Sequence, residues 1–121
     1  MDTPILIDYL RGHHRAAVVL EGEREIHVLH ASELTRLEVL SAMLPPDHDR
    51  TWALLSTLAW HPVDAEVAEE AGTLGRRWLP HHPAVDGADL AIAATAILLG
   101  AELLTVNVGH FPMFPGLRPP Y

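Results

Sequence analysis

One stretch near the C-terminal end, from Ala88 to Leu99, leaves the fewest options for the fold. At helical spacing it has almost no polar face, and Gly100 stands where such a helix would end. Because a helix that is apolar all round must be covered on two sides, we expect its own sheet on one side and a second element on the other. The chain has 121 residues, 49% of them hydrophobic, which predicts a single domain with a real core.

Elsewhere the sequence alternates amphipathic stretches with short apolar ones, some of them opened by residues typical of helix starts. Thr3 followed by Pro4 predicts one start, with Thr3 as the cap, and Ser32 and Asp64 are expected to cap two further helices. This alternation favours an α/β fold whose mostly parallel sheet is covered by helices on both faces. Helices are predicted over residues 5–11, 13–21, 33–44, 47–58, 65–79 and 88–99, and strands over 26–30, 60–63 and 103–106.

The charged residues exclude several classes of function. Sixteen acids oppose eight bases, all of them arginine, and the formal net charge is −8. A surface that binds nucleic acid through bulk positive charge is therefore not expected. The chain has neither cysteine nor lysine, which excludes thiolate zinc sites, cysteine nucleophiles, Schiff-base chemistry and Walker-type phosphate loops. With no visible signal peptide and no run long enough to span a bilayer, we expect a cytoplasmic domain without a membrane segment.

Acidic side chains fall close to the predicted carboxyl ends of strands. Asp2 precedes the first helix, Glu38 lies in the helix after strand 26–30, and Asp89 lies in the first turn of the apolar helix, while Asn107 ends the last predicted strand. Ligands bind at this edge of parallel sheets, and carboxylates gathered in one pocket favour a hard divalent cation such as Mg²⁺.

Taken singly, each acid also has an ordinary structural interpretation. Asp89 suits a helix N-terminus, Asp2 suits a helix start, and Glu38 could be an exposed partner of Arg36 or Arg50.

Four sequence blocks, in order along the chain, resemble the PIN-domain family, and among its members the VapC-type toxins of bacterial toxin–antitoxin pairs. The first is an aspartate-threonine pair followed by a Leu-Ile-Asp helix, and the second has the form Ser-x-x-Thr-x-x-Glu-x-Leu. The third is Asp-x-x-Ile-Ala-Ala-Thr-Ala, and the fourth matches the family's final strand and the turn after it. These blocks lie at Met1–Gly12, Ser32–Leu40, Asp89–Ala96 and Leu103–Phe111.

This resemblance implies that residues 1–121 form a single PIN domain with a three-layer α/β/α fold. It further implies a metal-dependent endoribonuclease that is held in check by a VapB-type antitoxin and forms a homodimer. The expected cofactor is Mg²⁺ or Mn²⁺. The catalytic residues would be Asp2, Glu38, Asp89 and Asn107, with the three acids as metal ligands, Thr3 and Thr105 as supporting hydroxyls, and Arg11 and Arg15 as candidate RNA contacts.

The sequence departs from the family pattern in two respects. Asn107 stands where many relatives have a fourth acid, and His110 where many have an aspartate, which leaves open whether one or two ions bind. Only Met1 precedes the aspartate-threonine pair, where relatives normally have a central strand, so we expect either an upstream start, which we favour, or an unusually short strand.

Other interpretations remain beside the nuclease. Asn107 and His110 could mark a decayed site in a catalytically inactive binding module, whereas a phospho-receiver is disfavoured by the missing lysine. The histidines match no zinc-ligand spacing, and His27 and His30 would point to opposite faces of a strand. Asp86 is interpreted as an exposed turn residue in preference to a member of the pocket, and Asp8 as a capping or ion-pairing residue. The RNA target and the antitoxin are left open.

Overall fold

The computed structural model describes all 121 residues and is mainly helical. No helix in it has the length and apolar character required to cross a membrane. In chain order the elements are α1 (Thr3–Leu10), α2 (His14–Ile26), β1 (His30–Ser32), α3 (Glu33–Ala42), the 3-10 turn η1 (Pro45–Asp47), α4 (His48–Leu55), β2 (Ala59–His61), α5 (Ala65–Trp78), α6 (Gly87–Leu99) and the 3-10 turn η2 (Val108–His110).

Two of the three predicted capping residues, Ser32 and Asp64, are confirmed. The side chain of Ser32 accepts from the N–H of Leu34, and that of Asp64 accepts from the N–H of Val67. The predicted cap of α1 was wrong by one residue, because Asp2 and not Thr3 takes the extended conformation that precedes the helix. An acidic cap stabilises the same helix equally well, since its carboxylate accepts a backbone N–H at the positive end of the helix dipole.

The parallel sheet is smaller than predicted. β1 pairs with β2 in parallel, His30 opposite Ala59 and Ser32 opposite His61, and no other strand joins them. The predicted strand 26–30 was wrong in position, because α2 continues to Ile26 and carries His27 as its cap. Residues 103–106 are irregular chain with a bend at Val106, so that prediction was also wrong. A strand needs a neighbouring backbone to bond, and among these residues only the carbonyl of Leu104 has one.

Two other predicted helices end elsewhere than expected. The helix predicted over 13–21 runs on to Ile26, and the one predicted over 47–58 divides into η1 and α4 and ends at Leu55. α6 has the predicted two-sided burial from Asp89 to Ala96, but its last three residues are partly exposed. Gly100 ends it in the left-handed conformation, with φ of 63°.

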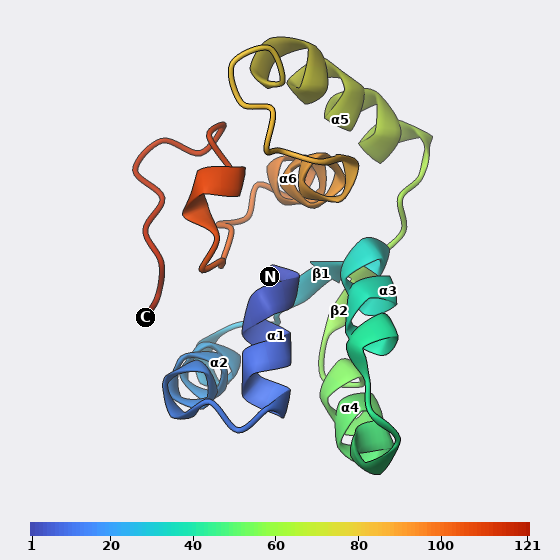
Figure 1. The fold of residues 1–121 in the computed structure, drawn as a ribbon, viewed down its shortest axis with the longest axis vertical. Helices are drawn as coiled ribbons and strands as arrows, with labels where there is room; N and C mark the ends of the chain where they lie inside the picture. Colours follow the sequence, from blue (N-terminus) through green and yellow to red (C-terminus); the bar gives the residue numbers. More distant parts are fainter.

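The molecule has two separate apolar cores, and its elements form two groups in the ribbon (Figure 1). We call residues 1–61 the N-terminal half, in which α1 to α4 surround the two strands, and residues 65–121 the C-terminal half, in which α5 and the C-terminal segment cover α6. Leu6, Leu20, Leu29, Val39, Leu54, Leu55 and Leu58 form the first core. Val67, Leu74, Val85, Leu90, Ala91, Ile92, Ala93, Ala94, Ala96, Leu103 and Phe111 form the second.

A groove of about 510 Å³ separates the two halves beside β1. Residues 27–32 form one wall and residues 99–104 the other. The backbone N–H groups of Glu102, Leu103 and Leu104 donate to no backbone acceptor. Met1 lines this groove, and its amino group donates to the carbonyl of His30 in the same half. The backbone N–H of Asp2 donates to the carbonyl of Leu104 in the other half.

The C-terminal end of the chain makes a second link between the halves. The hydroxyl of Tyr121 donates to Asp8 Oδ2 at 2.6 Å, and the Tyr121 ring packs on the ring of His13. The predicted capping or ion-pairing role of Asp8 was therefore wrong, because its partner is a phenol that lies 113 positions away in the sequence. Burial, followed by the hydrogen bond and the charge of Asp8, raises the pKa of the Tyr121 hydroxyl above its ordinary value.

Candidate active site

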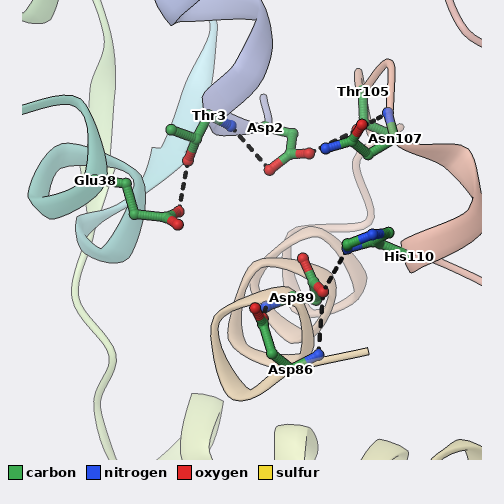
Figure 2. A network of polar contacts seen from close by, with 8 residues as sticks. All are labelled: Asp2, Thr3, Glu38, Asp86, Asp89, Thr105, Asn107 and His110. Atoms are coloured by element: carbon green, nitrogen blue, oxygen red, sulfur yellow. Dashed lines mark hydrogen bonds and ion pairs between the residues drawn. The ribbon is translucent and has the colours of Figure 1, made fainter. Parts of the chain in front are cut away.

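A second cleft, of about 600 Å³, opens where the two halves meet at the start of α1 and α6. Four of its lining residues are acidic, and none is arginine. The acids come from both halves of the molecule (Figure 2). Its polar lining consists of Asp2, Thr3, Glu38, Ser41, Asp86, Asp89, Asn107 and His110. The fold therefore brings Asp2, Glu38, Asp89 and Asn107, the predicted catalytic residues, to one cleft.

Asp2 is buried and held on both carboxylate oxygens. Its Oδ1 accepts from the backbone N–H of Thr3 at 2.8 Å, which is the helix cap of α1. Its Oδ2 accepts from the hydroxyl of Thr105 at 2.6 Å, from the other half of the molecule. Thr105 is fully buried, and its oxygen in turn accepts from the N–H of Asn107. The orientation of Asp2 is thus fixed by one local and one long-range hydrogen bond.

Glu38 points into the cleft from α3 and is held by hydroxyl groups. The hydroxyl of Thr3 donates to Glu38 Oε1 at 2.7 Å, and the buried hydroxyl of Thr35 lies 3.2 Å from that of Thr3. The alternative in which Glu38 pairs with a surface arginine was wrong. Arg36 binds Glu33 at 2.6 Å, and Arg50 lies 3.7 Å from Asp47.

Asp89 lies in the first turn of α6 and forms a capping box with Asp86. Asp86 Oδ1 accepts from the N–H of Asp89, and Asp89 Oδ2 accepts from the N–H of Asp86 at 3.1 Å. The same Oδ2 lies 3.0 Å from His110 Nδ1. Burial raises the pKa of Asp89 above its ordinary value; the backbone hydrogen bond to Asp86 opposes this rise, the charge of Asp86 adds to it, and His110 also opposes it.

Asp86 and His110 belong to the cleft, although the sequence interpretation gave neither a role there. Asp86 is indeed exposed, as predicted, but it caps α6 and lines the cleft as well. The signal for it was the spacing Asp86-x-x-Asp89, which is that of a capping box. A signal for His110 was also present in the sequence. It lies three residues after Asn107, in the same block, Leu103–Phe111, that supplies a predicted catalytic residue.

Arg11 and Arg15 do not line this cleft. Both are exposed, and they lie beyond the far end of α1 from Asp2 and Thr3. Their part in binding RNA stays a prediction.

The donor set of the cleft suits a hydrated divalent cation. No three histidine or acidic side chains converge closely enough to chelate one ion directly. Glu38 Oε2 and Asp89 Oδ1, however, accept no hydrogen bond from the protein, whereas their partner oxygens are occupied. Carboxylate oxygens with few direct contacts match Mg²⁺ or Mn²⁺, since Mg²⁺ keeps several of its waters when it binds to proteins.

Comparison with known proteins agrees with this geometry. The PIN domain model matches residues 1–111, so the chain belongs to the PIN-domain family. Within it the chain is of the VapC type. It is 43% identical to Ribonuclease VapC19 of Mycobacterium tuberculosis over 126 residues, which covers 100% of this chain and 98% of the relative. It is 34% identical to Ribonuclease VapC10 of the same organism over 121 residues, covering 100% of this chain and 91% of that protein.

Solved structures agree in fold. A toxin–antitoxin complex from Klebsiella pneumoniae superposes with a TM-score of 0.81 at 31% identity, covering 99% of this chain and 95% of the other. VapBC2 from Rickettsia felis, bound to a DNA fragment from its promoter, gives a TM-score of 0.75 at 23% identity, with 98% and 93% covered. The expected α/β class of PIN proteins with a parallel sheet is confirmed.

Proposed function

We propose that this VapC-type chain is an endoribonuclease toxin that hydrolyses RNA phosphodiester bonds, with residues 1–121 acting as one PIN domain. The observation that carries the proposal is the acidic cleft. Asp2, Glu38 and Asp89 come from three elements in two halves, and hydrogen bonds orient each carboxylate. Such orientation by outer hydrogen-bond partners is typical of carboxylates that bind a metal ion. The names of the similar ribonucleases support the same activity.

In this proposal Asp2, Glu38 and Asp89 hold Mg²⁺ or Mn²⁺ directly or through waters. A bound ion of this kind lowers the pKa of a coordinated water and neutralises charge on a phosphate. Thr3 and Thr105 hold the carboxylates in place, and Asn107 at the cleft's rim orients a water or a phosphate oxygen through its amide. Glu38 has the longest side chain of the three acids, and in this proposal it positions the attacking water.

The proposed partners are RNA, a VapB-type antitoxin and a second copy of the chain, all in the cytoplasm. The net charge of −8 favours a basic antitoxin segment, and the similarity to a toxin–antitoxin complex supports such a partner. Ile97, Leu98 and Leu99 leave the end of α6 partly exposed and apolar, which supports a homodimer. Arg11 and Arg15 are proposed to contact RNA outside the cleft.

A catalytically inactive binding module is the second candidate. It is favoured by Asn107 and His110, because neither supplies a fourth carboxylate to the cleft. The two candidates differ in metal binding: the nuclease requires Mg²⁺ or Mn²⁺ to bind at millimolar concentration, and an inert module does not.

The test combines RNA cleavage with toxicity in cells that lack the antitoxin. We expect Asp2→Ala, Glu38→Gln and Asp89→Ala each to reduce cleavage at least about 100-fold, since each removes a charge from the cleft, and to abolish toxicity. Glu66→Gln, on the exposed face of α5, is the matched control and is expected to behave as the unaltered protein. Full cleavage and toxicity in the Asp89→Ala protein, with unchanged circular dichroism, would overturn the proposal.

A further inference from the structure

His110 is the only side chain lining the acidic cleft that can carry a positive charge. His110 is the last residue of η2. Its backbone N–H donates to the carbonyl of Asn107 at 3.0 Å and so closes the turn. The next residue, Phe111, is fully buried in the core of the C-terminal half, so the backbone at His110 is anchored. The imidazole nevertheless stays 44% exposed, at the rim of the cleft.

Its ring nitrogen meets one particular oxygen of Asp89. Nδ1 lies 3.0 Å from Oδ2, the oxygen that also accepts the backbone N–H of Asp86 at 3.1 Å. Oδ1 accepts no hydrogen bond from the protein. When Asp89 is ionised its carboxylate can only accept, so Nδ1 of His110 is the donor in this contact. Two donors on one carboxylate oxygen then fix the plane of the group and leave the other oxygen facing the cleft (Figure 2).

We propose that His110 is a positioning residue, which holds Asp89 Oδ2 so that Oδ1 is the single oxygen offered to the divalent cation. The inference rests on the proposed function and adds to it, because it assigns a role to a histidine at a position where an acid would have added a ligand. The two other acids of the site are positioned by hydroxyl groups, Glu38 by that of Thr3 and Asp2 by that of Thr105.

The contact makes a specific prediction about which atom of the imidazole matters. The amide nitrogen of an asparagine falls close to the position of Nδ1, whereas that of a glutamine falls close to Nε2. His110→Asn can therefore keep the hydrogen bond to Asp89, and His110→Gln keeps only a polar group farther out. His110→Ala removes both.

The experiment measures Mn²⁺ binding without RNA, by the electron paramagnetic resonance signal of the free ion at one fixed pH. We expect His110→Ala to raise the Kd for Mn²⁺ about 10-fold, in line with the effect of removing outer partners of metal ligands. His110→Asn should return it to within about 3-fold of the unaltered value, and His110→Gln should not. His14→Ala, at an exposed position away from the cleft, is the control.

Melting temperatures of the variants separate loss of folding from loss of positioning. If His110→Ala does not fold, the test rests on the difference in Kd for Mn²⁺ between His110→Asn and His110→Gln. An unchanged Kd in folded His110→Ala, a rescue by Gln without rescue by Asn, or rescue by neither overturns the inference. If the unaltered protein and Asp89→Asn bind Mn²⁺ alike, the proposed metal site itself fails. If only Asp89→Asn loses binding, the site stands and the role of His110 fails.

Discussion

The two halves of the molecule achieve stability in different ways. In the C-terminal half a single nearly apolar helix, α6, is covered by α5 and the C-terminal segment, and the core follows directly from residue type. The N-terminal half instead assembles four amphipathic helices round a two-stranded sheet. Neither half contains the whole acidic cleft. The acidic cleft therefore depends on the junction between two cores and not on either core alone.

The carboxylates are also supported differently on the two sides. Those of the N-terminal half, Asp2 and Glu38, are oriented by threonine hydroxyls, one of which comes from across the junction. Asp89, in the C-terminal half, is oriented by a backbone N–H and by an imidazole. The two sides of one site therefore differ in the kind of side chain that orients each carboxylate, a hydroxyl on one side and an imidazole on the other.

The largest effect is expected from opening a cavity in one core, which tests whether the two halves differ in stability. We expect Phe111→Ala to lower the free energy of unfolding by about 4 kcal/mol, because a fully buried phenyl group is lost. Leu55→Ala in the other core is the matched variant, with an expected loss of about 3 kcal/mol.

Tryptophan fluorescence during denaturation reports one half at a time in variants that keep a single tryptophan, Trp78 for the C-terminal half or Trp60 for the other, with the remaining two tryptophans replaced by phenylalanine. Because each core has few buried residues, we expect one shared transition in both variants. Separate transitions would show that the halves fold independently.

A change of pH tests the buried amino group of Met1, beside the groove between the halves. Burial lowers the pKa of the Met1 amino group from 8.0 to about 6, and the charge of Asp2 acts in the opposite direction. Between these values the unfolded chain binds more protons than the folded one, so the free energy of unfolding rises as pH rises from 6 to 8. The rise is at most about 3 kcal/mol.

In a preparation that begins at Met1, acetylation of the amino group removes this titration and leaves the histidines in place. The quantity to measure is therefore the difference in urea midpoint between acetylated and free protein at pH 6 and pH 8. A difference that does not change with pH would contradict the buried position of this amino group.

The smallest expected effect concerns the hydrogen bond that joins the halves at the site. Thr105→Val deletes the hydroxyl that donates to Asp2 Oδ2, and we expect a loss of about 2 kcal/mol, since the acceptor is a buried carboxylate. Thr95→Val is the control, because its hydroxyl bonds only to the carbonyl of Ala91 within α6, at an expected cost of about 1 kcal/mol. Equal losses in chemical denaturation would remove the distinction between junction and core.

Local signals in the sequence predicted much of the secondary structure. Ser32, Asp64 and Gly100 mark helix boundaries where the structure has them, because capping depends on a few neighbouring atoms. The errors in predicted secondary structure occur where a partner distant in the sequence decides whether a strand forms. The segment 103–106 is apolar enough for a strand, yet its only backbone hydrogen bond comes from Asp2. The first strand begins at His30 and not at Ile26, because its pairing with β2 starts there.

By itself, then, the sequence determined the α/β class, the buried character of α6 and the set of acids that resemble a PIN site. The first two properties depend on residue type and on spacing within one element, and the third on a family resemblance that four blocks of the sequence carry together. Only the tertiary structure decided which oxygen of each acid is free, that the predicted supporting hydroxyl of Thr105 binds Asp2, 103 positions away, and that His110 contacts Asp89. Such contacts join elements whose relative placement depends on how two cores pack, and no local pattern records that placement.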